Sequence, residues 1–346
     1  MSQSQGAQTA PAMPDQNAIS SELRRNVTAA NIIPLWESGT TAFVQGTEQA
    51  FHWPWRVMQP IMQETARITI PAILERRVMM MVNPTIPRNE SECCSGLLSA
   101  GIQALMPGEV ARPHRHSMHA LRFVLEGDGG ETIVEGKHCA MLPGDLVVTP
   151  GWTWHEHHNP QGRPTLWVDI LDVAIHRALR NDRFQPGPPQ GMKDIAPDRA
   201  FANGGLVPAG LEAASAGYSP IFRYAAEDAN RAVDAAPAGP DGARLARYVN
   251  PVTGGPVLPT IDCCLMRLEQ GAATASLHSS GSRVCVVVEG EGESSIGDTL
   301  VAWGPKDVFT IPHGQPVSHR CLAGPARIFM ASDGVIHDRL QLGART

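Results

Sequence analysis

Residues 113–123 have the sequence PHRHSMHALRF and place three histidines within six residues, with one residue between His114 and His116. Successive side chains of a β-strand point to opposite faces, so both imidazoles would leave the same face, which in a barrel can be the interior. A second cluster, WTWHEHHN at residues 152–159, contains His155. On a later strand of an antiparallel barrel, His155 can bring a third imidazole to the same place.

Three imidazoles in one pocket predict a metal site. Neutral imidazoles with open positions beside them suit a catalytic divalent ion better than a closed structural one. The alternative is that these are surface histidines or hydrogen-bonded core histidines, which is the usual role of a lone histidine. The paired histidines with a third in register favour the metal site, so we expect His114, His116 and His155 to be its ligands.

The bulk composition indicates a globular protein. Its 346 residues are enough for two domains, and 42% hydrophobic residues are enough to fill their cores. With 28 Lys and Arg against 34 Asp and Glu, and no basic run, we expect no nucleic-acid partner. The first residues lack an apolar leader and no window approaches roughly 18 uninterrupted apolar residues, so we expect no membrane contact and a cytoplasmic location.

The composition changes along the chain and predicts four parts. Short runs rich in Val, Ile, Leu and Thr, separated by Gly, Pro or Asn, are typical of antiparallel barrels. Segments rich in Pro, Gly and Ala suit irregular connection. The predicted parts are a tail and helical extension (1–76), a first barrel (77–172), a linker with one helix near SPIFRYAAEDANRAV (173–259) and a second barrel (260–346).

The two strand-rich parts resemble each other. FVLEGDGGETIVEG in the first has a counterpart in VVVEGEGESSIGD in the second. In this alignment Asp145 corresponds to Asp307, and Pro150 to Pro312. The repeat predicts a mainly β protein that carries two copies of one barrel.

The histidine motifs resemble those of the cupin superfamily. The first cupin motif matches Gly108-X5-His114-X-His116, and the second matches Gly144-X5-Pro150-X-Trp152-X2-His155-X3-Asn159. Trp152 stands where the second motif has glycine. Many metallocupins add a glutamate shortly after the second histidine, where this chain has Ala120 and Leu121. The resemblance therefore implies a bicupin of two jelly-roll barrels with a three-histidine site, and it disfavours the oxalate-decarboxylase type.

Longer phrases resemble one family, the gentisate 1,2-dioxygenases with their salicylate and 1-hydroxy-2-naphthoate relatives. These phrases are MPGEVARPHRHSMHALRFVLEG, TPGWTWHEHHN, LWVDILD, HWPWRVMQPIM, ERRVMMMVNP and RYVNPVTGGPVLPTID. The resemblance covers nearly the whole chain. It implies Fe(II), a homotetramer, and insertion of O2 between the carboxyl-bearing and hydroxyl-bearing ring carbons of an aromatic ortho-hydroxy acid, giving a ring-opened oxo-diacid.

Four side chains near the ligands are candidates for substrate chemistry. Arg122 alternates to the face of the two ligands on its strand and could hold the substrate carboxylate, with a structural ion pair as the alternative. His157 shares the face of His155 and could act as acid or base. Asp169 could orient His157 or cap a strand end, and of the two arginines in ERRV we favour Arg77 over Arg76 for the pocket. By resemblance, substrate contacts are also expected from Ser99, Gly101, Gln103 and Trp167.

Two departures from the family pattern concern the pocket. Relatives commonly read LWAGIQ where this chain reads LSAGIQ, so Ser99 replaces a pocket tryptophan and should enlarge the site and add a hydroxyl. His119 stands where relatives carry a small or amide side chain, and we assign it a tuning or surface role. We therefore expect a substrate whose substituent differs from gentisate's 5-hydroxyl or is larger, such as a nitro- or halogen-substituted salicylate.

The second barrel is expected to hold no metal. Aligned from Glu289 backwards, the three ligand positions fall on Leu277, Ser279 and Val317, whereas His278 and His319 correspond to Arg115 and His157. Two other functions stay open from the sequence: a non-catalytic cupin that binds aromatic acids, and a metallocupin of another reaction.

Overall fold

The computed structural model describes residues 21–30, 48–67, 76–86, 93–187, 196–202, 206–209 and 218–342. The chain divides into two compact units, Met1–Thr47 and Glu48–Thr346. The first contributes helix α1 (Ser21–Ala29), and the polar tail expected over residues 1 to about 18 lies outside the described residues.

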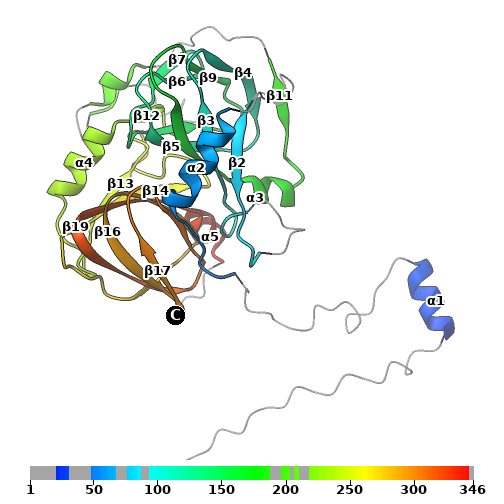
Figure 1. Ribbon diagram of the computed structural model, residues 1–346. Helices are drawn as coiled ribbons and strands as arrows, with labels where there is room; N and C mark the ends of the chain where they lie inside the picture. The colour runs from blue at the N-terminus through cyan, green and yellow to red at the C-terminus, as the bar shows by residue number, and fades with distance from the viewer. Residues whose placement is uncertain are drawn as a thin grey trace, which may run out of the picture. The chain divides into compact units, whose positions relative to one another are not determined.

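Two antiparallel sheets form the first barrel, in the upper part of Figure 1. The six-stranded sheet, in spatial order, contains β12 (Arg223–Tyr224), β8 (Leu146–Thr149), β5 (Ala120–Glu126), β10 (Thr165–Leu171), β3 (Ser99–Leu105) and β2 (Arg77–Met81). The five-stranded sheet contains β11 (Phe184–Pro186), β4 (Glu109–His116), β9 (His155–Asn159), β6 (Glu131–Val134) and β7 (Lys137–Ala140).

One eight-stranded sheet forms the second barrel, in the lower part of Figure 1. Its strands are β1 (His52–Trp53), β18 (Val308–Ile311), β16 (Arg283–Ile296), β19 (Pro316–Ser332), β14 (Asp262–Leu268) and β13 (Arg244–Tyr248), with β15 (Leu277–His278) on β19 and β17 (Thr299–Trp303) on β16. The helices of this unit are α2 (Trp55–Thr65), α3 (Val173–Ala178), α4 (Ala226–Ala235), α5 (Gly334–Leu340) and the 3₁₀ turn η4 (Asp198–Phe201). The prediction of a mainly β bicupin is confirmed.

The aligned aspartates explain how each barrel binds a strand and helix from elsewhere in the chain. Asp145 accepts a hydrogen bond from the backbone N–H of Ala226, the first residue of α4, at 2.9 Å. Asp307 accepts one from Trp55, the first residue of α2, at 2.6 Å. Strand β12, just before α4, pairs with β8, and β1, just before α2, pairs with β18. The segment before each barrel in the sequence is therefore anchored on the other barrel.

The two barrels also share buried apolar side chains. One hydrophobic cluster contains residues from both, and the rings of Phe123 and Phe329 stack across it with centroids 4.2 Å apart. A second cluster fills the interior of the second barrel with side chains such as Val317, Trp303 and Ile311. Burial of apolar surface in these clusters is the main force that holds the barrels together.

All seven cysteines are free, and six of them are buried. Among the described residues, no helix is long and apolar enough to cross a membrane. The segment expected as an irregular linker with one helix carries strands β11, β12 and β13, helices α3 and α4, and the 3₁₀ turn η4. The four-part division of the chain stays a prediction.

Candidate metal centre

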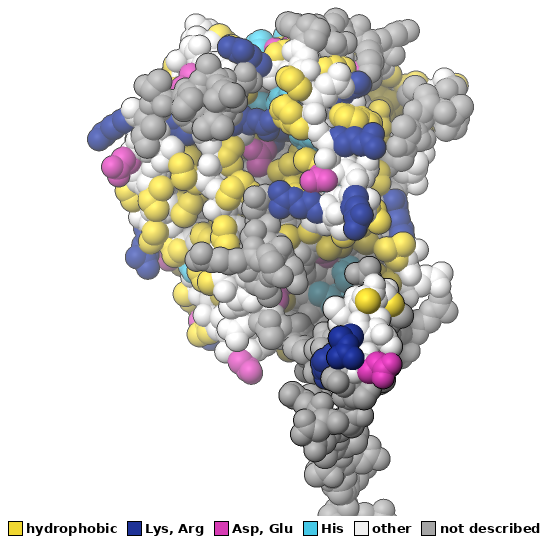
Figure 2. Space-filling view, turned by 90° about the vertical axis from the view of Figure 1, so that its right-hand side faces the viewer, with side chains coloured by type: hydrophobic (Ala, Val, Ile, Leu, Met, Phe, Trp, Pro, Cys, Tyr) yellow, Lys and Arg dark blue, Asp and Glu magenta, His cyan; other side chains and the backbone are white. Residues whose placement is uncertain are grey.

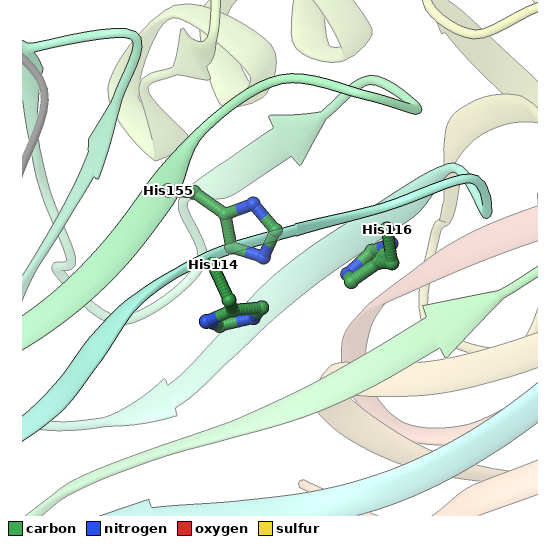
Figure 3. A group of neighbouring side chains, drawn as sticks. All are labelled: His114, His116 and His155. Carbon is green, nitrogen blue, oxygen red and sulfur yellow. The ribbon is translucent and has the colours of Figure 1, made fainter. Parts of the chain in front are cut away.

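Three histidines converge inside the first barrel. His114 and His116 come from β4 and His155 from β9, and the register pairs His114 directly with His155. Their candidate ligand nitrogens all lie within 4.8 Å of one another, and each residue is at most 3% exposed. Figure 3 shows the three imidazoles close together, projecting from their strands. Among the described residues, no other such group of metal-ligating side chains occurs.

Backbone carbonyls fix the tautomer of all three rings. Each Nδ1 lies against a carbonyl two residues away: His114 against Arg112 at 2.8 Å, His116 against Met118 at 2.8 Å and His155 against Thr153 at 3.0 Å. A carbonyl oxygen only accepts, so each Nδ1 must carry the hydrogen and each Nε2 presents a bare lone pair. The Nε2 atoms of His114 and His155 are buried and have no hydrogen-bond partner among the described residues.

Electrostatics keeps these rings neutral. Burial, aided by the positive charge of Arg76, lowers the pKa of His114 to about 3, and burial lowers the pKa of His116 to about 3 as well. Burial also holds the pKa of His155 well below its usual range. Neutral imidazole is the form that binds a metal ion, and orphaned buried nitrogens are costly unless something occupies them. The three residues therefore fit a divalent metal with open coordination positions.

His157 lies beside the candidate ligands, and its buried Nε2 has no hydrogen-bond partner among the described residues. Its ring centroid is 5.9 Å from that of His155 and 5.5 Å from that of Trp167 on the opposite sheet. Nδ1 lies 2.9 Å from the Thr132 hydroxyl, which donates its hydrogen to the sulfur of Met141 at 3.2 Å. With the Thr132 hydrogen directed to this sulfur, Nδ1 of His157 is the donor and Nε2 is a buried acceptor without a partner among the described residues.

Arg122 and Asp169 form a buried pair on the six-stranded sheet. They are register partners, and Nε of Arg122 lies 3.3 Å from Oδ1 of Asp169. Arg122 also donates to the Thr149 hydroxyl at 2.5 Å. Burial lowers the pKa of Arg122 while Asp169 acts against that shift, and burial raises the pKa of Asp169 while Arg122 acts against it. Asp169 lies at Nε and Thr149 accepts from Nη1, so Nη2 of Arg122 is left to bind a second anion.

The remaining β3 and β10 candidates share the face of this pair. Directly opposed residues of antiparallel strands lie on one face, and the register pairs Asp169 with Gly101 and Trp167 with Gln103. Nε2 of Gln103 is buried without a hydrogen-bond partner among the described residues. A Cβ on Gly101 would lie 2.9 Å from Cγ1 of Val78, so glycine allows β2 to approach closely.

Ser99 lies at the end of the same row and is fully buried. Its hydroxyl donates to the Leu171 carbonyl at 3.3 Å. The hydrogen of this hydroxyl is thus already used, and the small side chain offers the pocket no free donor.

The preference for Arg77 over Arg76 is wrong. Arg77 donates from both terminal nitrogens to Glu109, at 2.7 and 3.0 Å, and from Nε to the Thr65 carbonyl at 3.0 Å. Arg76 instead contributes positive charge at His114, His157 and Asp169. The register explains the difference: Val78 pairs with Gln103, so Arg76, two residues before Val78, alternates to the inner face.

Phe184 is a site residue that the sequence did not reveal. Its ring stacks on His114 with centroids 5.3 Å apart, and the guanidinium of Arg76 lies 5.6 Å from its centroid. It belongs to β11, which pairs with the ligand strand β4. The only signal in the sequence is a single aromatic residue within a Pro- and Gly-rich segment, which does not predict a strand.

His119 lies outside the ligand group and supports a turn next to it. The Nδ1 of its ring accepts a hydrogen bond from the backbone N–H of Gly151 at 2.9 Å. The backbone N–H of His119 donates to the Asp172 carboxylate at 2.8 Å. His158 alternates away from the interior and pairs with Glu156 at 2.8 Å.

Trp152, which replaces the glycine of the motif, adopts a left-handed backbone conformation with φ of 63°. A side chain in this region costs about 1–2 kcal/mol. Its N–H donates to the carbonyl of His116 at 2.7 Å, and the next residue, Thr153, supplies the carbonyl that orients His155. The strained turn therefore connects two of the three candidate ligands.

The second barrel repeats this geometry without the ligands. Leu277 pairs with Val317 as His114 pairs with His155, and His319 contacts the Ser294 hydroxyl at 2.7 Å as His157 contacts Thr132. The hydroxyl of Ser279 donates to the carbonyl of Gly281. Apolar side chains thus occupy two of the three ligand positions, as the repeat alignment predicted.

Comparisons with known proteins agree with this geometry. The cupin domain family matches residues 101–171. The gentisate 1,2-dioxygenase 1 of Aquipseudomonas alcaligenes is 31% identical over 90% of this chain and 91% of its own. The 5-aminosalicylate 1,2-dioxygenase of a Comamonas species is 30% identical over 90% of this chain and 86% of its own. The salicylate 1,2-dioxygenase of Pseudoaminobacter salicylatoxidans, solved with gentisate, superposes with a TM-score of 0.84 at 30% identity over 95% of both chains. The chain belongs to the gentisate and salicylate 1,2-dioxygenase family of bicupin ring-cleaving enzymes.

Proposed function

We propose that this protein is an Fe(II)-dependent dioxygenase that opens the ring of a 5-substituted salicylate. Both atoms of O2 would enter between the carboxyl-bearing and hydroxyl-bearing carbons, which gives a ring-opened oxo-diacid. The observation that carries the proposal is the set of three buried histidines with bare Nε2 atoms inside a barrel that also buries the guanidinium of Arg122. When bound by His114, His116 and His155, ferrous iron would supply Lewis acidity and a path for electrons from the ring to O2.

The arginines give the substrate carboxylate its binding site. Arg122 is 2% exposed, so its charge acts in a medium of low dielectric constant where an anion is strongly attracted. Arg76 adds positive charge to the same cluster. Phe184, stacked on His114, offers an apolar wall against which an aromatic ring can pack.

His157 is the residue placed to hold the proton of the ortho-hydroxyl group. Its Nε2 is a buried acceptor, and the hydrogen bond between Nδ1 and Thr132 at 2.9 Å fixes its orientation. Burial and the charge of Arg122 hold the pKa of His157 well below its usual range, so the ring enters the reaction neutral, and an anion bound at Arg122 would act against this shift.

Substrate choice is assigned to the space at Ser99. Where relatives commonly have tryptophan, this chain has a small buried side chain whose hydroxyl is bound to Leu171. Space without a free donor favours an added substituent over a hydroxyl that seeks a partner. A relative named for 5-aminosalicylate supports the substrate class.

A turnover panel tests this function. Protein reconstituted with Fe(II) under anaerobic conditions is mixed with gentisate, salicylate, 5-nitro-, 5-chloro- or 5-aminosalicylate, or 1-hydroxy-2-naphthoate, and then exposed to air. We expect O2 uptake with a new ultraviolet absorbance, and a higher kcat/KM for a 5-substituted salicylate than for gentisate. The Ser99→Trp variant should lose that preference. Tight binding without O2 uptake would instead identify a non-catalytic cupin, and a gentisate kcat/KM orders of magnitude above all others would overturn the substrate assignment.

The homotetramer implied by the family is part of the proposal. Strand β2 ends the six-stranded sheet, and α2 exposes Val57 and Ile61. Figure 2, seen from the right-hand side of Figure 1, shows hydrophobic side chains among arginines and lysines on that face. Covering an edge strand and exposed apolar side chains is a common reason for self-association. Light scattering on the purified protein should give four times the mass of one chain.

A further inference from the structure

Arg115 lies between the two candidate ligands of β4, yet its side chain belongs to the other face of the strand. Its guanidinium carbon is 5.0 Å from the ring centroid of Trp152 and 4.7 Å from that of Trp154. Its Nε donates to the side-chain oxygen of Gln185 at 2.9 Å. The two tryptophans and Gln185 thus hold one cation on the outer side of the metal centre.

The residues that Arg115 contacts are those that set the ligand geometry. Trp152 has the left-handed backbone and binds the carbonyl of His116 through its N–H at 2.7 Å. Between the two tryptophans, Thr153 accepts the Nδ1 hydrogen of His155 at 3.0 Å. Displacement of either tryptophan would therefore move the Thr153 carbonyl that orients His155 and the backbone hydrogen bond that holds the end of β4 at His116.

The far side of the turn is anchored independently. Trp154 donates its N–H to the Glu135 carboxylate at 2.7 Å, and its carbonyl accepts the N–H of Glu135 at 2.8 Å. Trp154 is therefore fixed by the β6–β7 hairpin. Trp152, by contrast, is 42% exposed and strained, and the described contact on its ring is the stacked guanidinium.

We propose that Arg115 is a positioning residue of the metal centre. Arg115 bridges the ring of Trp154, whose backbone is anchored on Glu135, to the ring of Trp152. It thereby stabilises the left-handed turn and sets the placement of His116 and His155. A planar guanidinium can stack on two indole faces and still donate from Nε, which a lysine ammonium group cannot reproduce, so we expect lysine to be a poorer substitute. The inference rests on the metal site of the proposed function but assigns a residue that touches neither metal nor substrate.

Cobalt titration tests the inference with a readout that does not depend on turnover. Metal-free wild-type protein, Arg115→Met and Arg115→Lys are titrated with Co(II), and the visible d–d bands are recorded. Loss of an outer support of a metal ligand typically weakens metal binding roughly 10- to 100-fold. We expect such a loss in Arg115→Met, with shifted d–d bands, and a smaller loss in Arg115→Lys. Arg163→Met, which removes an exposed arginine paired with Asp128, is the matched control and should bind Co(II) as the wild type does.

A rescue variant separates this role from general destabilisation. Glycine adopts a left-handed backbone without steric cost, so Arg115→Met combined with Trp152→Gly should regain Co(II) affinity to within about threefold of the wild type. Wild-type affinity and spectrum in Arg115→Met would overturn the inference, as would a double variant as weak as the single one. If Arg115→Met does not fold, Arg115→Lys with and without Trp152→Gly gives the same comparison. Failure of the wild-type protein to bind Co(II) would count against the proposed function instead.

Discussion

At the scale of single residues, hydrogen-bond directions decide which nitrogen of each histidine is available. His155 and His158 are three residues apart on β9 and therefore lie on opposite faces of the strand, in different surroundings. Nδ1 of His155 is bound to a carbonyl and its Nε2 is buried without a partner among the described residues, whereas His158 pairs with a carboxylate. Chemistry at the metal centre therefore depends on alternation along the strand and on the backbone carbonyls.

The pair His155 and His158 gives a direct test of the ligand assignment. His155→Ala should lower both Co(II) affinity and turnover by more than the roughly 10- to 100-fold that loss of an outer support costs. His158→Ala should leave both within about threefold of the wild type, because its side chain lies on the outer face. Equal losses in the two variants, measured by metal titration and O2 uptake, would remove His155 from the ligand set.

His319 predicts how acid affects stability. Burial and the charge of Arg283 lower the pKa of His319 to about 4. Between pH 6.5 and pH 4 the unfolded chain takes up a proton that the folded protein does not, so the free energy of unfolding falls as pH falls, by about 1.4 kcal/mol per pH unit from this group. The difference in unfolding free energy between the wild type and His319→Gln, measured in urea, should therefore be constant near neutral pH and should change as pH falls below about 6.5. By pH 4 the wild type should have lost about 3 kcal/mol more than the variant; parallel curves would contradict this.

At the scale of elements, strand β2 shows how register divides two adjacent arginines between two tasks. Arg77 joins β2 to β4 through the carboxylate of Glu109, at 2.7 and 3.0 Å, and so ties the two sheets of the first barrel together. Arg76 lies on the inner side with the histidines. Alternation alone requires that only one of them reach the pocket, but the pairing of Val78 with Gln103 decides which one it is.

Matched substitutions at these arginines should separate binding from stability. Arg76→Met is expected to raise the KM for a salicylate roughly 10- to 100-fold with little change in unfolding, since it removes charge that faces the substrate carboxylate. Arg77→Met is expected to lower the free energy of unfolding by about 1–3 kcal/mol with little change in KM, since it leaves Glu109 without its ion pair. Kinetics and urea unfolding on both variants check this, and the reverse pattern would restore the original preference for Arg77.

At the scale of the whole molecule, the two barrels resemble each other in sequence but differ in the side chains at the ligand positions. The first contains a cluster of neutral histidines and a buried arginine, whereas the ligand positions of the second are Ser279, the exposed Leu277 and the buried Val317. Each barrel also anchors the strand and helix that precede the other, through Asp145 and Asp307. The apolar barrel with its anchored helix is thus a scaffold for the first.

Metal stoichiometry tests this division of labour. Protein reconstituted with Fe(II) should contain one metal per chain, because Leu277, Ser279 and Val317 offer no set of three nitrogen or carboxylate ligands. Elemental analysis after removal of loosely bound metal is the measurement. The ratio should fall to near zero in His155→Ala and stay at one in His319→Gln, and two metals per chain in the wild type would show that the second barrel retains a site.

The sequence by itself determined the fold class, the repeat, the family and the three histidines that meet, because alternation on strands and motif spacing depend only on order along the chain. It also predicted which positions of the second barrel lost their ligands. It did not determine that Arg76 rather than Arg77 faces inward, that Phe184 stacks on His114, or that Arg115 lies between two tryptophans. Those facts depend on strand register and on pairing between segments far apart in the chain, such as β11 with β4, and only the packed structure fixes these.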